Sequence, residues 1–281
     1  MSVVGMVVHR DRDEALLLAK RAIAWLGERG HQVRIPSDDA AAGGLDELSC
    51  PDERLCDDLD LAISLGGDGT MLRTVDLVAS AGVPILGINV GRLGYLPECE
   101  PDDLEGALER FFAGDFVTEE RMTLDVRSDG KFPPVTALNE AWLEKTVPGH
   151  TVHMRLDIAG STFTTYAADG LIVSTPTGST AYNLSVRGPI VSPTLRAMVV
   201  KAVSPHQLFD FPLVLGPDEE VRVEVLEGRT ATLLVDGRSI GELVPGDAIT
   251  CSAGSHPARL IRFGERDFHQ ILKAKFGLTD R

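Results

Sequence analysis

The residues best suited to chemistry form a glycine-rich pentapeptide, Gly66-Gly67-Asp68-Gly69-Thr70. It follows the apolar run Leu61–Leu65 and precedes a helix-like pattern, so it predicts a strand, a tight turn and a helix start. The glycines let phosphate oxygens approach backbone N–H groups at a helix N-terminus. Asp68 is placed to accept a proton from, or orient, a hydroxyl that attacks a phosphate. Alternatively, Asp68 or Thr70 caps the helix and the glycines close a turn.

A second candidate segment is rich in hydroxyl groups, with four Ser/Thr side chains and Tyr182 within Thr175–Tyr182. The preceding run Leu171–Ser174 predicts a strand, and Pro176 and Gly178 interrupt it before a short helix. These side chains can donate to a polar ligand and stack on a planar ring. The alternative is an elaborate helix cap, because Ser and Thr are common at helix starts.

A third candidate is the pair Asn139-Glu140 within the apolar run Ala137–Leu143. Adjacent residues of one strand point to opposite faces, so at least one is expected to face inward and need a partner. The Glu140 carboxylate suits vicinal ribose hydroxyls, whereas Asn139 suits a base edge or a backbone contact.

The elements that must position the glycine turn alternate between strands and helices, which favours a parallel sheet with helices outside. Strands are predicted at Val3–His9, Gln32–Ile35, Leu59–Leu65 and Pro84–Asn89, and helices at 11–29, 70–81 and 102–112. Ser37–Asp58 is rich in Ala, Gly, Asp and Pro and is predicted to be a long surface loop. Gly91–Leu96 is a second glycine-bearing loop, at the sheet edge where open α/β sheets bind ligands.

From Arg121 onward the pattern changes to short alternating stretches, so the second half is predicted to be mainly β. Asp-Gly, Pro-Gly, Ala-Gly and Glu-Gly pairs punctuate these stretches, as expected of antiparallel hairpins. The domain boundary is predicted near 116–121, and Asp267–Phe276 is predicted to be a closing helix. The expected strands are Thr123–Arg127, Thr136–Leu143, His153–Ile158, Leu171–Thr175, Val221–Leu226, Thr230–Val235 and Ala248–Cys251.

Composition narrows the class of protein. The 281 residues carry 42 acidic and 27 basic side chains, and this net charge of −15 would repel a nucleic-acid backbone or an anionic membrane. No apolar run approaches the roughly 20 residues of a membrane span, and the N-terminus lacks a basic n-region, so a cytoplasmic protein is expected. The four cysteines show no C-x-x-C spacing and indicate buried or idle thiols.

Four motifs together resemble the NAD kinase family, in order and approximate spacing: GGDGT at 66–70, LNE at 138–140, DGLIVSTPTGSTAYNLS at 169–185 and GPIVSP at 188–193. The similarity extends from the opening strand to about residue 262. The resemblance implies an α/β N-terminal domain with a parallel sheet at 1–118 and a β-rich, sandwich-like NAD-binding domain at 119–262. It further implies a ligand in the cleft between them, with the closing helix, 263–281, packed on the N-terminal domain.

The resemblance also implies an activity, the transfer of a phosphoryl group from ATP or polyphosphate to the adenosine ribose 2′-hydroxyl of NAD, giving NADP. Asp68 would be the proton acceptor, Tyr182 would stack on adenine, and Asp169 would reach the nicotinamide part of a ligand on a neighbouring subunit. Mg²⁺ or another divalent cation would arrive with the donor, without a dedicated metal site, and a homo-oligomer, dimer or tetramer, is expected. The other implied nucleotide-binding residues are Gly69, Arg73, Asn139, Glu140, His153, Thr177, Thr180, Ala181, Asn183, Leu184, Ser185 and Arg238.

Three positions depart from the family pattern. Ala167 stands where many bacterial members have Arg or Lys, Arg187 replaces the first Gly of the usual GGP, and Phe211 replaces Arg before Pro212. Arg187 is a candidate for supplying the cation missing at Ala167. Two other functions stay open: a lipid or sugar kinase that shares the GGDG turn, and a catalytically idle NAD(P)-binding regulator.

Overall fold

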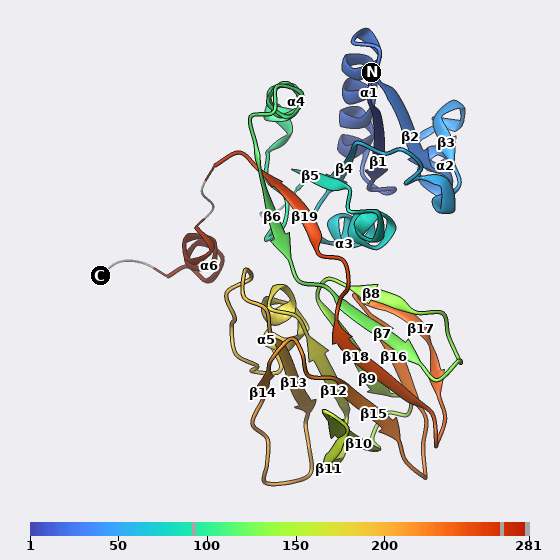
Figure 1. Ribbon diagram of the computed structural model, residues 1–281, viewed down its shortest axis with the longest axis vertical. Helices are drawn as coiled ribbons and strands as arrows, with labels where there is room; N and C mark the ends of the chain where they lie inside the picture. Colours follow the sequence, from blue (N-terminus) through green and yellow to red (C-terminus); the bar gives the residue numbers. More distant parts are fainter. Residues whose placement is uncertain (92–93, 265–266, 279–281) are drawn as a thin grey trace. The chain divides into compact units, whose positions relative to one another are not determined.

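The computed structural model describes residues 1–91, 94–264 and 267–278, and its chain divides into two compact units (Figure 1). The first unit is Met1–Glu120 together with Ala258–Arg281, and the second is Arg121–Pro257. The predicted β-rich domain, 119–262, is therefore too long at its C-terminal end. The last strand of the chain, Ala258–Arg262, belongs to the sheet of the first unit.

The first unit is built on a seven-stranded sheet in the order β3-β2-β1-β4-β5-β19-β6. Neighbouring strands from β3 to β19 run parallel, which confirms the predicted parallel sheet. The strands are β1 Val3–Val8, β2 Gln32–Pro36, β3 Ser49–Cys50, β4 Leu61–Gly66, β5 Pro84–Asn89, β6 Val117–Arg121 and β19 Ala258–Arg262.

Helices cover both faces of this sheet. The buried side chains of α1 and α4 share one hydrophobic cluster with alternate residues of β1, β4 and β5. Met71 of α3 lies against Gly87 on the opposite face of β5. None of the described helices is long and apolar enough to cross a membrane. The helices are α1 Asp13–Glu28, α2 Ser37–Gly43, α3 Asp68–Val78, α4 Leu104–Phe112 and α6 Phe268–Phe276, with 3₁₀ turns η3 Ala79–Ala81 and η4 Pro101–Asp103.

The predicted surface loop Ser37–Asp58 is wrong. This segment forms α2, β3 and two 3₁₀ turns, η1 Asp46–Leu48 and η2 Asp52–Arg54. The prediction took the acidic residues of this segment to be exposed to solvent, but Asp39 is only 1% exposed. Its carboxylate accepts hydrogen bonds from the Val8 amide and from two arginines, which makes burial of the charge possible.

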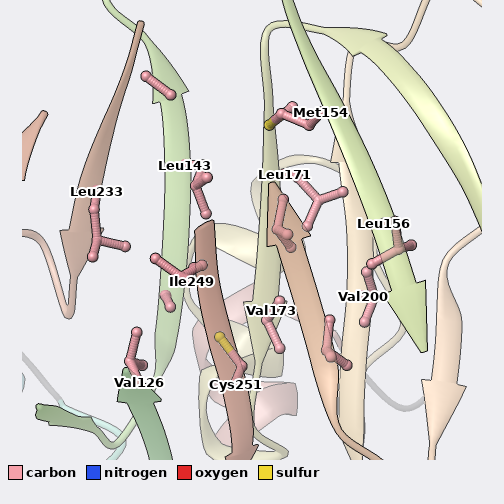
Figure 2. Close-up of a cluster of buried hydrophobic side chains, with 14 of the residues drawn as sticks. Val126, Leu143, Met154, Leu156, Leu171, Val173, Val200, Leu233, Ile249 and Cys251 are labelled. Carbon is pink, nitrogen blue, oxygen red and sulfur yellow. The ribbon is translucent and has the colours of Figure 1, made fainter. Parts of the chain in front are cut away.

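The second unit is a sandwich of two six-stranded antiparallel sheets, ordered β11-β10-β15-β18-β7-β8 and β14-β13-β12-β9-β16-β17. Figure 2 shows side chains of both sheets, among them Leu156, Leu171 and Ile249, meeting in the core between them. The elements are β7 Leu124–Ser128, β8 Val135–Ala137, β9 Glu140–Lys145, β10 Val152–Ile158, β11 Ser161–Ala168, β12 Gly170–Ser174, η5 Thr177–Thr180, α5 Tyr182–Ser185, β13 Met198–Val203, β14 Leu213–Leu215, β15 Val221–Val225, β16 Ala231–Val235, β17 Arg238–Leu243 and β18 Ala248–Ala253.

One strand prediction in this unit is wrong in an informative way. Thr136–Leu143 is not a single strand, because β8 ends at Ala137 in one sheet and β9 begins at Glu140 in the other. Leu138 and Asn139 are the crossing between the two layers of the sandwich. Asn139 and Glu140 are therefore not opposite-facing neighbours of one strand. The strands β11, β13, β14 and β17 were not predicted.

Candidate active site

The glycine turn begins α3 two residues earlier than predicted. Gly67 is the N-cap, with φ −99° and ψ −161°, and Asp68 is the first residue of the helix. The amides of Thr70 and Met71 both donate to the Gly67 carbonyl. Gly66 must lack a side chain, because a Cβ there would collide with the Thr70 hydroxyl, and Thr70 is buried.

The Asp68 carboxylate is held by the loop that follows β5. Its Oδ1 accepts from the backbone amides of Tyr95 (2.8 Å) and Leu96 (2.9 Å), and its Oδ2 has one longer contact, 3.1 Å, from Tyr95 N. Gly94 permits this approach, since a Cβ there would lie 2.7 Å from Oδ1. Among described residues the carboxylate has no other hydrogen bond, so Asp68 does not cap the helix. Arg92 and Leu93 of the predicted loop lie outside the described residues.

A cavity of about 740 Å³ opens at this turn, a size typical of small-molecule sites. All of its lining residues belong to the first unit: His9, Arg10, Asp11, Arg12, Gly67, Asp68, Gly69, Thr70, Arg73, Val90, Gly91 and Gly94. Arg73, predicted to contact nucleotide, lines the cavity but is bonded to Asp39 at 2.5 Å and to the Val8 carbonyl at 2.8 Å. Gly69 is exposed there, and a Cβ would meet open space.

In the second unit the crossing at 138–140 is fixed by a residue that the sequence did not indicate, Asp236. Its carboxylate accepts from the amides of Leu138 (2.7 Å), Asn139 (2.8 Å) and Glu140 (3.1 Å). Asp236 has a φ of +47°, between β16 and β17. The Asp-Gly pair at 236–237 predicts a turn. Nothing in the sequence indicates that the Asp236 side chain bonds backbone amides almost 100 residues away.

Glu140 is buried, with 8% of its surface exposed, and its Oε2 has no hydrogen-bond partner among the described residues. Burial, reinforced by the negative charge of Asp236, raises the pKa of Glu140 to about 8, although a hydrogen bond from the Tyr182 backbone opposes the shift. Burial also raises the pKa of Asp236, against the opposing effect of its three amide donors. An unpartnered buried carboxylate oxygen suits a ligand hydroxyl that donates to it.

Two aromatic rings that contact each other belong to residues linked to Glu140: Trp142 follows it in β9, and the Tyr182 backbone hydrogen-bonds to it. The Tyr182 ring centroid lies 4.2 Å from that of Trp142, which sequence reasoning did not single out. The Trp142 Nε1 is buried without a hydrogen-bond partner among the described residues. Asp169, predicted to reach a nicotinamide, forms an ion pair with Lys145.

The hydroxyls of the Thr175–Tyr182 segment bond mostly to other protein groups, and neither η5 nor α5 has a side-chain cap. Thr175 Oγ1 donates to the Leu138 carbonyl, Ser179 Oγ bonds the Val191 backbone, and Thr180 Oγ1 donates to the Thr177 carbonyl. Gly178 approaches the Asn139 carbonyl so closely that no Cβ fits between them.

The remaining predicted residues are spread around this unit. Asn183 is fully buried and donates to the Ser179 and Pro189 carbonyls at 3.2 and 3.1 Å. His153 is exposed on β10, opposite Ala167, and the charge of Arg238 acts on Asp236. Thr177 is buried, Thr180, Ala181 and Leu184 are half-buried and Ser185 is exposed. The contact of each with nucleotide stays a prediction.

Two of the three positions that depart from the family pattern, Arg187 and Phe211, lie at the protein surface. Arg187 is exposed and has a φ of +62°, the left-handed region that favours glycine. Phe211 is 71% exposed and contacts Phe209, which in turn contacts Phe163. The idea that Arg187 compensates for Ala167 stays a prediction.

Comparison with known proteins covers both units. Residues 4–116 match the ATP-NAD kinase N-terminal domain family, and residues 138–263 match the ATP-NAD kinase C-terminal domain family. An NAD kinase of Heliobacterium modesticaldum is 43% identical, with 98% of each chain covered, and one of Moorella thermoacetica is 40% identical, with 98% of this chain and 89% of the relative covered.

Solved structures resemble the chain over its whole length. A yeast NADH kinase complexed with NADH superposes with a TM-score of 0.91 at 23% identity, covering 100% of this chain and 89% of the other. An Archaeoglobus fulgidus NAD kinase in complex with ATP gives a TM-score of 0.77 at 25% identity, with both chains fully covered.

A parallel α/β unit with a glycine turn, joined to an antiparallel sandwich, defines a two-domain kinase. The chain belongs to the NAD kinase family, as its matched domains and its relatives at 43% and 40% identity show. It is an enzyme of that family.

Proposed function

We propose that this enzyme transfers the terminal phosphoryl group of ATP to the 2′-hydroxyl of the adenosine ribose of NAD, giving NADP and ADP. The 2′-oxygen forms a bond to the γ-phosphorus as the bond from that phosphorus to the leaving ADP oxygen breaks. The hydroxyl proton passes to the Asp68 carboxylate. Because the transition state of phosphoryl transfer is loose, alignment of the two oxygens and charge neutralisation supply most of the acceleration.

The observation that carries this proposal is the way Asp68 is held. Two backbone amides occupy Oδ1, whereas Oδ2 has only the longer contact from Tyr95 N and keeps capacity to accept a proton. The residue lies at the N-terminus of an 11-residue helix and lines the cavity of the glycine turn. Both the N–H groups and the helix dipole favour phosphate there.

The second unit supports the acceptor part of the proposal. Glu140 Oε2 is buried without a described partner, and Trp142 of the same strand forms an aromatic pair with Tyr182, whose backbone hydrogen-bonds to Glu140. The Glu140 carboxyl group can hydrogen-bond ribose hydroxyls, and an aromatic face suits a base. Relatives named NAD kinase, and a solved relative complexed with NADH, agree with a dinucleotide acceptor.

For the donor we propose ATP, with a divalent cation carried on its phosphates. A solved relative is complexed with ATP. Mg²⁺ usually keeps several waters and is bound largely through substrate phosphates, so the cation would be held mainly by the donor itself. The cation would neutralise charge on the transferring group. The expectation of a homo-oligomer stays a prediction.

The experiment that tests the proposal is product formation across a matrix of two acceptors, NAD and NADH, and two donors, ATP and inorganic polyphosphate, with Mg²⁺. We expect NADP from NAD and ATP, identified as the 2′-phosphate by chromatography against 2′- and 3′-phosphorylated standards. Failure to phosphorylate either acceptor with either donor would overturn the proposal. A product from polyphosphate alone would correct the donor.

A further inference from the structure

The cavity at the glycine turn is lined by three arginines, two of which are already neutralised. Arg73 and Arg10 both bond the buried carboxylate of Asp39, at 2.5 and 2.8 Å, and Arg10 also pairs with Asp38 at 3.1 Å. The positive charges of Arg73 and Arg10 are therefore largely compensated by these aspartates. Arg12 is the third arginine, and its environment is different.

Arg12 has no carboxylate within ion-pair distance among the described residues. Its Nη1 donates to the Val90 carbonyl, a neutral acceptor. Gly91, with a φ of +112°, makes room for it, because a Cβ at Gly91 would collide with the guanidinium. Neighbouring Asp11 also lines the cavity, but it forms no ion pair with Arg12. The guanidinium is thus fixed in position while its charge stays uncompensated.

Val90 connects this guanidinium to the glycine turn. The Val90 amide donates to the Gly66 carbonyl at 3.0 Å, and the carbonyl of the same residue accepts from Arg12. A single peptide segment therefore sets the distance between the charge of Arg12 and the N-terminus of α3. No other described residue accepts a hydrogen bond from the Arg12 guanidinium, so its remaining nitrogens can donate to a ligand.

We propose that Arg12 binds the phosphates of the phosphoryl donor in this cavity. In a chain of net charge −15 a polyphosphate needs a local cation, and a planar guanidinium bonds phosphate oxygens in pairs. The donor is favoured over the pyrophosphate of NAD because Arg12 shares the cavity with Asp68, where the terminal phosphate must lie. The inference rests on the proposed function for the identity of the donor.

The kinetic test compares Arg12→Ala with wild type. We expect the KM for ATP to rise at least 10-fold, with the KM for NAD unchanged within about 2-fold, and Arg12→Lys to recover part of the loss because it keeps the charge. Arg21→Ala is the matched control, since Arg21 lies in α1, the helix that Arg12 precedes, pairs with Glu105 and is outside the cavity. An unchanged KM for ATP, or a rise confined to NAD, would overturn the inference.

A binding measurement separates this inference from the proposed function. Calorimetric titration with inorganic tripolyphosphate needs no catalysis, and we expect at least 10-fold weaker binding to Arg12→Ala than to wild type or Arg21→Ala. If wild type made no NADP yet bound tripolyphosphate through Arg12, the proposed function would fail and the subsite would stand. If wild type, Arg12→Ala and Arg21→Ala all bound tripolyphosphate equally, the inference that Arg12 binds phosphate would be wrong. Arg12→Gln, which keeps a donor for Val90, replaces Arg12→Ala if thermal melting shows that the alanine variant is unfolded.

Discussion

Asp68 is positioned by main-chain donors, and this makes its geometry separable from its charge. The amides of Tyr95 and Leu96 bond to Oδ1, and Oδ1 of an asparagine could accept both. The residue can therefore lose its ability to take a proton without losing its place in the fold.

We predict that Asp68→Asn lowers kcat by on the order of 100-fold or more, the range expected for loss of a general base. Its melting temperature should stay near that of wild type, because both amide bonds to Oδ1 survive. Asp68→Ala is the matched control, and it should lose stability as well as activity, since it leaves the two amides without their acceptor. Wild-type turnover in the asparagine variant would remove Asp68 from the mechanism.

Glu140 supplies a prediction about pH. Its pKa is raised to about 8 in the folded protein, so the folded state keeps a proton that the unfolded chain releases above pH 4.5. This contribution to stability is fully present below pH 4.5 and is lost as the pH rises through 8. As this contribution is lost, the free energy of unfolding falls by up to about 1.4 kcal/mol for each pH unit between 4.5 and 8.

Glu140→Gln should remove this component, so its free energy of unfolding should fall less steeply between pH 5 and 8 than that of wild type. Denaturant unfolding followed by tryptophan fluorescence measures the slope. The Trp25→Phe background leaves Trp142 as the reporter of the second unit, because the chain has only two tryptophans. Parallel slopes for the two proteins would show that Glu140 is ionised in the folded state.

At the scale of elements, the junction between β8 and β9 depends on a distant hairpin. The chain crosses between sheets at Leu138 and Asn139, where ladder hydrogen bonds stop. Asp236, at the turn between β16 and β17, supplies the missing acceptors to three consecutive amides. One carboxylate thus fixes the segment that carries Glu140.

Asp236→Ala should destabilise the second unit by at least about 2 kcal/mol, because it leaves three backbone donors without their acceptor. Asp236→Asn is the control: it tolerates the positive φ and keeps Oδ1, which serves Asn139 and Glu140, so its loss should be smaller. Chemical denaturation measures both. Equal stability of wild type and the alanine variant would mean that water replaces the carboxylate.

Arg187 follows the short helix α5 in a left-handed conformation that costs an L-residue about 1–2 kcal/mol. Arg187→Gly should therefore raise the free energy of unfolding by about 1 kcal/mol, after the entropy of the glycine in the unfolded chain is counted. Arg187→Ala also removes the guanidinium but keeps the Cβ, so it should not stabilise. Thermal melting of the two variants distinguishes backbone strain from a side-chain effect.

At the scale of the whole molecule, the first unit is discontinuous in sequence. The chain leaves it after β6, builds the sandwich, and returns as β19 between β5 and β6 (Figure 1). Arg262 of β19 is 3% exposed in its side chain and pairs with Glu98 and Glu119 at 3.2 and 2.9 Å. The last strand therefore supplies both apolar burial and the cation for two partly buried carboxylates.

Truncation after Pro257 should consequently unfold the first unit while the sandwich of the second unit, Arg121–Pro257, stays folded. Truncation after Gly264 is the control, because it keeps β19 and removes α6, which buries none of its described residues. Hydrogen exchange of β5 amides reports the difference. Protected β5 amides in the shorter protein would show that β19 is dispensable.

The sequence alone determined the features written in local patterns. Alternation of apolar strands and helices predicted the parallel sheet, and regular turn glycines predicted the antiparallel half. Four motifs in order and spacing predicted the NAD kinase family, which the domain matches confirm. These signals are readable because side-chain periodicity and glycine placement follow from the geometry of single elements.

Only the tertiary structure decided which groups hold the site. Asp68 is separated from Tyr95 and Leu96 by 27 and 28 positions in the sequence. Asp236 is separated from the residues 138–140 that it bonds by 96 to 98 positions. The donors are backbone amides, which every residue except proline carries, so no residue type marks them in the sequence. No residue pattern marks the uncompensated charge of Arg12 either, because it depends on where the end of β5 places Val90 and where α2 places Asp39.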